Sequence, residues 1–85
     1  MTTRITMYGA RWCGDCRRSK ALLDTYDVDY EWVDLEAEPD RIGEVTRRND
    51  GRRIIPTIVF EDGTHLAEPT DAELARRLGI ELPTG

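Results

Sequence analysis

The sequence predicts a single α/β domain in which a four-stranded mixed sheet is flanked by three helices, in the order β-α-β-α-β-β-α. Segments with helical spacing of apolar residues alternate with short apolar runs that are typical of strands. The first strand–helix–strand unit implies a parallel pair with a right-handed crossover, and a later hairpin adds an antiparallel pair. At 85 residues the chain has room for one modest core. We therefore treat residues 1–85 as one domain, with its core at about residues 4–79 and a C-terminal tail at residues 80–85.

Four segments predict strands. Residues 4–8 (RITMY) alternate between apolar and polar side chains, and Gly9 is expected to break this strand. Residues 28–35 (VDYEWVDL) are rich in aromatic and β-branched side chains, which favours a second strand. Residues 57–60 form a strongly apolar third strand, and an acidic turn with glycine returns the chain into a fourth at residues 64–67.

Three segments predict helices. Residues 14–26 carry leucines and other apolar residues at helical spacing. A second helix is expected to begin near Pro39, because proline is tolerated in a first turn, and to end at residues 49–51 (NDG). Thr70 is the predicted N-cap of the third helix, since Glu73 three residues later completes a capping-box pattern.

The composition restricts the possible partners. The chain has 12 basic and 17 acidic residues, which gives a net charge of -5 and argues against binding to a nucleic-acid backbone. No apolar run approaches the roughly 18 residues of a membrane span, and the N-terminus has no apolar core of a signal peptide. We expect a cytoplasmic protein that acts as a monomer, with neither a nucleic-acid nor a membrane partner.

The cysteines indicate redox chemistry. Cys13 and Cys16 are the only two in the chain, whereas a small secreted domain stapled by disulfides would have more, spread along the sequence. A structural zinc site needs about four ligands, and the only histidine, His65, leaves the set incomplete. We therefore expect no bound metal and no bound cofactor.

The position of the cysteine pair indicates how it would react. Cys13 falls where a strand-to-helix loop meets the predicted first helix, and a helix N-terminus favours a thiolate. Cys16 lies three residues further on, so one helical turn can bring its sulfur within disulfide range. The outer thiolate can attack a disulfide, and the inner thiol can then resolve the mixed disulfide. The alternative is that both cysteines are simply small buried apolar residues.

Pro56 is the second feature of the predicted site. In this architecture a proline that opens the third strand would face the dithiol loop. With a cis bond, the backbone of Ile55 would be free to pair with a peptide-like substrate beside Cys13. The alternative is an ordinary trans proline at the start of a strand, which is the default for most X-Pro bonds.

Several stretches of the sequence together resemble a known family. They are ARWCGDCRRSKALL, which follows the first strand, then DYEWVDLE, then IIPTIVFEDGTHL, and EPTDAEL at the start of the last helix. Over residues 4–78 the chain resembles glutaredoxin-type proteins of the thioredoxin superfamily, and most closely the mycoredoxins. The resemblance implies a thioredoxin-like (glutaredoxin) fold and disulfide reductase activity. It implies Cys13 as the nucleophile, Cys16 as the resolving thiol, and Ile55 and Pro56 as the substrate contact at a cis proline.

The resemblance also implies a low-molecular-weight thiol as co-substrate. Many glutaredoxins have Pro-Tyr between the cysteines and a Gly-Gly-x-Asp sequence after the fourth strand, and both help to define the glutathione site. This chain has Gly14 and Asp15 at the first place and residues 67–71 (AEPTD) at the second. We therefore favour mycothiol over glutathione. The implied partners are disulfide-bonded or S-thiolated client proteins and the reductase of the thiol.

Charged residues near the cysteines are expected to tune the reaction. Asp15 opposes formation of the thiolate by like-charge repulsion, whereas Arg11, Arg17 and Arg18 favour it. The alternative for Asp15 is a first-turn acid that suits the helix dipole.

Trp12 and the arginines before Pro56 are further candidate substrate contacts. Trp12 is expected to lie flat at the edge of the site as a docking surface for partners, and ordinary packing is the alternative. By the resemblance, Arg52 or Arg53 would contact a carboxylate of the thiol, and we select Arg53 together with Arg11. The alternative for this basic cluster is a solvated helix end.

The sequence is also compatible with two other functions. WCGDC differs from the WCGPC of a thioredoxin only at Asp15, so the chain could be a dithiol donor recharged by thioredoxin reductase, for example for ribonucleotide reductase. A homodimer could instead bridge one 2Fe–2S cluster through Cys13, as some glutaredoxins do with bound glutathione.

Overall fold

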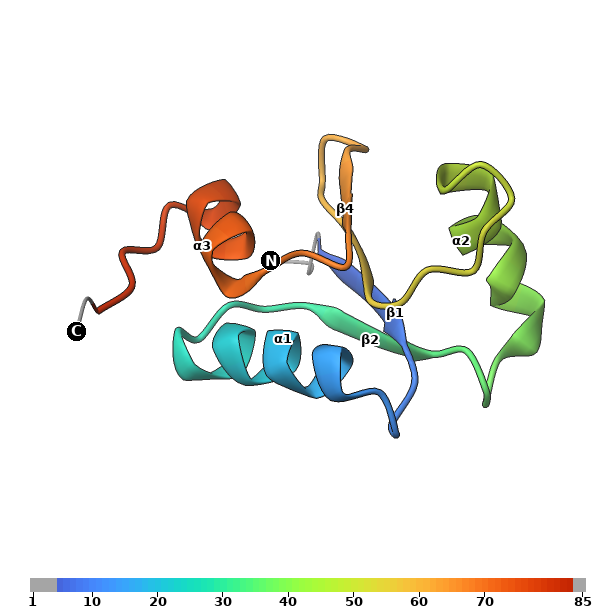
Figure 1. Cartoon of the computed structure of the whole chain (residues 1–85), viewed down its shortest axis with the longest axis horizontal. Helices are drawn as coiled ribbons and strands as arrows, with labels where there is room; N and C mark the ends of the chain where they lie inside the picture. Colours follow the sequence, from blue (N-terminus) through green and yellow to red (C-terminus); the bar gives the residue numbers. More distant parts are fainter. Residues whose placement is uncertain (1–4, 84–85) are drawn as a thin grey trace.

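The computed structural model describes residues 5–83 (Figure 1). The elements follow the predicted order, with one short 3₁₀ helix added before the second α-helix. Their bounds are β1 Thr6–Gly9, α1 Gly14–Thr25, β2 Glu31–Asp34, η1 Pro39–Arg41, α2 Ile42–Arg48, β3 Thr57–Val59, β4 His65–Ala67 and α3 Asp71–Leu78.

The four strands form one mixed sheet in the order β2-β1-β3-β4. β1 runs parallel to β2, with Met7 opposite Trp32, and antiparallel to β3, with Met7 opposite Ile58. β3 and β4 form the predicted antiparallel hairpin, in which Ile58 lies opposite Leu66. The two inner strands are therefore β1, which leads into the loop with Cys13, and β3, which directly follows Pro56.

The helices cover both faces of the sheet because successive residues of β1 point to opposite sides. Met7 packs with Leu22, Leu23 and Leu74, so α1 and α3 cover one face. The neighbouring Tyr8 packs on the other face, which α2 covers (Figure 1). The second core cluster comprises Tyr8, Val33, Leu35 and Val45, with Ile42, Ile55 and Val59 packed against it.

Several predicted ends of strands were wrong. Gly9 does not break the first strand but forms its last residue, paired with Asp34 of β2. β2 begins only at Glu31, because the backbone N–H of Val28 bonds to the carbonyl of Leu23 and closes the end of α1. β3 ends before Phe60 and β4 begins after Thr64. The predicted start of β1 at Arg4 lies outside the described residues.

Local signals at the helix ends were more reliable. The predicted capping box is confirmed: the Thr70 side chain accepts from the Glu73 N–H at 3.1 Å, and the Glu73 carboxylate accepts from the Thr70 N–H at 2.7 Å. Gly79 ends α3 with a φ of 72°, a conformation that glycine adopts without strain. Beyond it, Leu82 of the predicted tail packs against the core.

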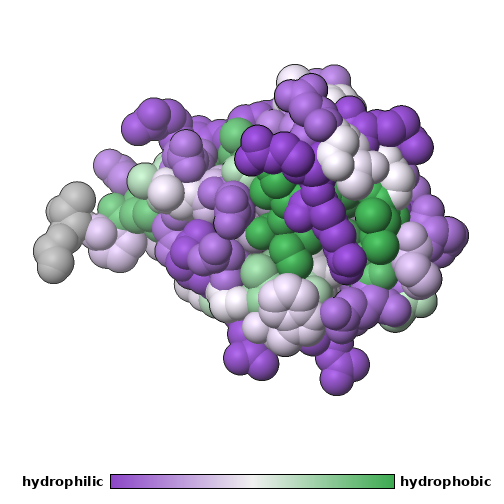
Figure 2. All heavy atoms as spheres, turned by 45° about the vertical axis from the view of Figure 1, so that its right-hand side comes forward, coloured by the Kyte–Doolittle hydropathy of each residue, from purple (hydrophilic) through white to green (hydrophobic). Residues whose placement is uncertain are grey.

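The surface is strongly polar. Hydrophilic side chains cover most of the face seen in Figure 2, with apolar side chains gathered near its middle. Trp12 and Tyr26 are the exposed large hydrophobic residues among those described. Within residues 5–83 no helix combines the length and apolar character that a membrane crossing needs.

Candidate active site

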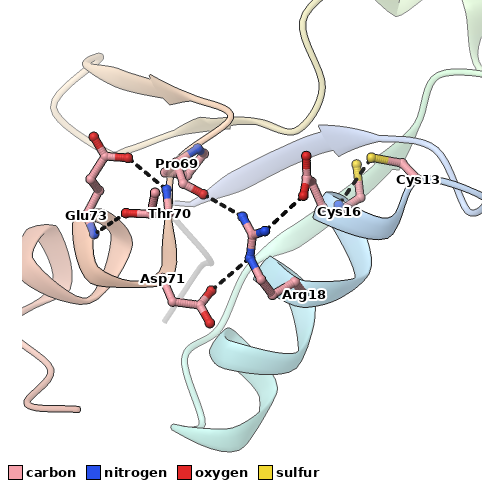
Figure 3. Close-up of polar contacts among 8 residues, drawn as sticks. Cys13, Cys16, Arg18, Pro69, Thr70, Asp71 and Glu73 are labelled. Atoms are coloured by element: carbon pink, nitrogen blue, oxygen red, sulfur yellow. Dashed lines mark hydrogen bonds and ion pairs between the residues drawn. The ribbon is translucent and has the colours of Figure 1, made fainter. Parts of the chain in front are cut away.

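The loop after β1 places Cys13 at the N-cap of α1. Its backbone N–H bonds to the carbonyl of Ala10 at 3.2 Å, which closes a tight turn between strand and helix. The Cys13 side chain takes the place of an N-cap oxygen, because its Sγ accepts the backbone N–H of Cys16 at 3.2 Å (Figure 3). A sulfur in this position faces backbone donors and the positive end of the helix, and both favour a thiolate.

Cys16 lies beneath Cys13. Both cysteines are free thiols, Cys13 with 8% of its surface exposed and Cys16 with 0%. Burial raises the pKa of the Cys16 thiol to about 12, and the hydrogen bond with Cys13 adds to this effect. The buried thiol is therefore neutral at physiological pH, and only Cys13 has any access to solvent.

Apolar side chains enclose the two sulfurs. Ala10, Cys13 and Cys16 form a small cluster, with Trp32 of β2 and Ile55 packed against it. The Nζ of Lys20 lies 4.2 Å from the centre of the Trp32 ring and forms a cation–π contact with that indole. This packing explains why Cys16 has no contact with solvent.

The Ile55–Pro56 bond is cis, as predicted. Ile55 belongs to the dithiol cluster, which brings this segment next to the cysteines, and Pro56 is fully buried. A hydrogen-bond chain fixes the segment: the Thr57 hydroxyl donates to the Ile54 carbonyl at 2.7 Å and accepts from Asn49 Nδ2 at 3.1 Å. Asn49 therefore ties the end of α2 to the loop beside the dithiol.

Trp12 stands at the surface beside Cys13. Trp12 is 64% exposed, and its Nε1 donates to Glu36 Oε2 at 2.7 Å. An open polar cavity of about 550 Å³ lies next to it. The residues that line this cavity are Arg11, Trp12, Arg17, Asp34, Glu36 and Ala37.

The charged residues predicted to act at the site have different contacts in the structure. Asp15 pairs with Arg18, at 2.8 Å between Oδ1 and Nη1. Arg17 instead donates from Nε to the Arg11 carbonyl at 3.1 Å. Arg53 is exposed and has no ion pair with any of residues 5–83.

Three contacts of the site were not predicted from the sequence: Trp12 with Glu36, Asp15 with Arg18, and Asn49 with Thr57 beside Pro56. Trp12 and Glu36 are 24 positions apart, and Asn49 and Thr57 are 8 apart in different elements, so no pattern within one element indicates these two contacts. Asp15 and Arg18 are spaced i,i+3 on one helix, which is a pattern that favours an ion pair. Among the described residues, no three His, Cys, Asp or Glu side chains are grouped to hold a metal ion.

A slightly exposed thiol with a fully buried thiol beneath it is an arrangement suited to thiol–disulfide exchange. Together with the β-α-β-α-β-β-α topology, this pair defines the class of thiol–disulfide oxidoreductases with a thioredoxin-like fold. The family model described as glutaredoxin matches residues 5–66, which is well over half of the chain. The chain therefore belongs to the glutaredoxin family, whose members use a thiol co-substrate to act on disulfide clients.

Individual relatives agree with this assignment. A provisionally named glutaredoxin of Mycobacterium tuberculosis is 36% identical over 92% of this chain and 93% of its own length. Mycoredoxin 1 of Corynebacterium glutamicum is 33% identical, with coverage of 89% and 94%. The crystal structure of a glutaredoxin from Methanosarcina mazei superimposes with a TM-score of 0.75 at 27% identity, over 91% of this chain and 79% of that one.

Proposed function

We propose that this protein reduces mixed disulfides between client proteins and a low-molecular-weight thiol, acting as a monomer in the cytoplasm. Cys13 is the nucleophile and Cys16 the resolving thiol. The observation that carries the proposal is the placement of Cys13 at the N-cap of α1, where its sulfur accepts the Cys16 N–H and keeps some exposure above a fully buried partner.

The reaction consists of two thiol–disulfide exchanges. The Cys13 thiolate forms a bond to the sulfur of the low-molecular-weight thiol, and the S–S bond to the client breaks. The client leaves as a thiolate and takes a proton from water. A second thiol molecule, as its thiolate, then attacks the same low-molecular-weight sulfur and releases the Cys13 thiolate. The product is the disulfide of two thiol molecules, which the thiol's own reductase returns to two thiols with NADPH.

Cys16 supports a second route. After loss of its proton it can attack Cys13 in the mixed disulfide, which forms a Cys13–Cys16 disulfide and releases the low-molecular-weight thiol. Since burial holds the pKa of Cys16 at about 12, this route needs a base or a change in the surroundings of the thiol. We therefore expect Cys16 to be dispensable for removal of the thiol from clients, yet required for direct reduction of protein disulfides.

We propose mycothiol as the co-substrate. Two observations support this choice: the similarity to Mycoredoxin 1, and the open polar cavity beside Trp12, whose charged walls suit a strongly polar thiol. Trp12, Arg11 and Arg53 would contact the thiol or the client. Ile55 and Pro56 would border the substrate at the dithiol cluster.

A thioredoxin-like dithiol donor is the second candidate. It is favoured by the sequence Trp-Cys-Gly-x-Cys and by the closeness of the two cysteines, since the Cys16 backbone nitrogen lies 3.2 Å from the Cys13 sulfur. The two candidates differ in how the protein is recharged. NADPH consumption with an S-thiolated client is measured in two systems, one with mycothiol and its reductase and one with thioredoxin reductase alone.

We expect turnover with mycothiol, its persistence in Cys16→Ser and its loss in Cys13→Ser. Turnover only with thioredoxin reductase, lost in Cys16→Ser, would reject the mycothiol-dependent function and favour the dithiol donor.

A further inference from the structure

Arg18 joins the dithiol motif to the start of α3. Its Nη1 pairs with Asp15 Oδ1 at 2.8 Å, its Nη2 donates to the Pro69 carbonyl at 2.9 Å, and its Nε pairs with Asp71 Oδ1 at 3.2 Å (Figure 3). All three kinds of nitrogen in the guanidinium are therefore occupied. A planar fork bound on several sides has one orientation rather than a range of rotamers.

Both anchors of Arg18 outside the motif are themselves fixed. Pro69 is fully buried, and Asp71 is the first residue of α3, directly after the capping box of Thr70 and Glu73. The contacts thus hold the guanidinium from the α3 side, while Asp15 approaches it from the α1 side. Asp15 is held at the same time, because its Oδ1 lies on this fixed group.

The carboxylate of Asp15 stands between the two cysteines in the sequence and in the first turn of α1. A negative charge there repels a thiolate on Cys13. Paired with a guanidinium, the same carboxylate has a weaker field, because the two charges oppose each other over a short distance. The free energy of the thiolate therefore depends on where Arg18 holds Asp15.

We propose that Arg18 is a positioning residue for the reaction, which holds the Asp15 carboxylate in an ion pair facing α3 and so limits its repulsion of the Cys13 thiolate. The proposal deepens the proposed function and rests on Cys13 being the nucleophile. It assigns to Arg18 a role that Arg17 does not share, since Arg17 is bound to the Arg11 carbonyl and forms no ion pair within residues 5–83.

Both helices that meet here carry several charges. α1 carries Asp15, Arg17, Arg18, Lys20 and Asp24, and α3 carries Asp71, Glu73, Arg76 and Arg77. The neighbouring loops add Arg11, Glu36 and Glu68, and among residues 5–83 only Asp15 and Asp71 form ion pairs with Arg18. The side chains of Arg18, Asp15 and Asp71 are 42%, 48% and 41% exposed. Solvent and salt therefore screen the pair, so we expect a modest effect that shrinks at high ionic strength.

The test measures the pH profile of iodoacetamide alkylation at Cys13 in the reduced protein, with the site identified by mass spectrometry. The variants are Arg18→Gln, Asp15→Asn and the double variant. Arg17→Gln and Asp15→Asn/Arg17→Gln form the matched control, with the same loss of charge one residue away.

We expect Arg18→Gln to move the midpoint of the profile upward by about half a pH unit, a roughly 3-fold lower rate below the midpoint. The shift should be clearly smaller when Asp15 is already Asn, and Arg18→Lys should restore part of it. Arg17→Gln should instead shift the profile by the same amount whether residue 15 is Asp or Asn.

Two results would overturn the proposal. Equal, additive shifts for Arg17→Gln and Arg18→Gln would make Arg18 only one of several nearby cations. A lower unfolding free energy without any shift of the midpoint would make it only a structural link to α3.

Turnover of the wild-type protein with an S-thiolated client is measured in parallel. Absence of turnover would reject the proposed function. The alkylation data would still decide whether Arg18 and Asp15 are coupled.

Discussion

Gly9 and Cys16 are in direct contact at the junction of β1 and α1. A Cβ on Gly9 would lie 2.5 Å from the Cys16 sulfur and 3.0 Å from Cη2 of Trp32. Neither neighbour can withdraw easily, because Cys16 belongs to the buried dithiol cluster and Trp32 is packed against that cluster. The buried thiol therefore depends on a glycine in the neighbouring strand.

Gly9→Ala should be destabilising for this reason. An added methyl group in a close-packed core typically costs about 1–3 kcal/mol. Urea unfolding of the reduced protein measures the loss. Gly14→Ala is the control, because a Cβ there meets nothing within 4 Å. A loss of stability at Gly14 equal to that at Gly9 would contradict the close contact.

The high pKa of Cys16 predicts selective alkylation. With a pKa of about 12, caused mainly by burial, this thiol stays neutral across the range in which cysteines are usually labelled. Iodoacetamide at neutral pH should therefore modify Cys13 in the folded, reduced protein and leave Cys16 unmodified. Peptide mapping by mass spectrometry identifies the site. Unfolding in guanidinium chloride should make both cysteines reactive, and comparable labelling of Cys16 in the folded protein would contradict its burial.

The same thiol makes stability depend on pH at the alkaline end. An unfolded cysteine loses its proton near pH 9.0, whereas Cys16 in the fold keeps it up to about 12. Between these values the folded state binds more protons, so the free energy of unfolding falls as pH rises. Cys16→Ala should show a shallower decline between pH 9.0 and about 12, measured by urea unfolding. Equal declines in both proteins would reject this source of the pH dependence.

The hydrogen-bond chain from Asn49 to Ile54 should be sensitive to Thr57. Thr57→Val keeps the shape of the side chain but removes the donor to the half-buried Ile54 carbonyl and one acceptor of the buried Asn49 amide, which keeps its bond to the Val45 carbonyl. A buried polar group that loses its partner costs about 1–3 kcal/mol. The variant should therefore unfold at lower urea concentration. Thr25→Val, at an exposed position, is the control, and similar losses in both variants would show that the chain of bonds contributes nothing.

The sequence was sufficient where the signal is local. The capping box of Thr70 and Glu73 needs only residues three apart, and it is present as predicted. The junction of strand and helix at Cys13 follows from where hydrophobic periodicity changes, and the N-cap lies at this residue. The order of elements and the parallel pairing of β1 with β2 follow from the same patterns and the handedness of crossovers.

The sequence was insufficient where a contact depends on packing between distant segments. As a glycine, Gly9 suggested that the strand breaks there. In the structure it is the last residue of β1, and a side chain at this position would collide with the Cys16 sulfur. Trp12 and Glu36 meet across 24 positions, and Arg18 reaches Asp71 across 53. The sequence suggested that several arginines influence Cys13, but only the geometry separates Arg18 from Arg17.

Trapping the first intermediate tests directly whether Cys13 attacks the sulfur of the low-molecular-weight thiol. Cys16→Ser is incubated with an S-mycothiolated client, and the mass of each protein is measured after rapid acid quenching. We expect Cys13 to gain the mass of mycothiol while the client loses it, and Cys13→Ser to show no transfer. An adduct between Cys13 and the client protein, or transfer that persists in Cys13→Ser, would contradict this expectation.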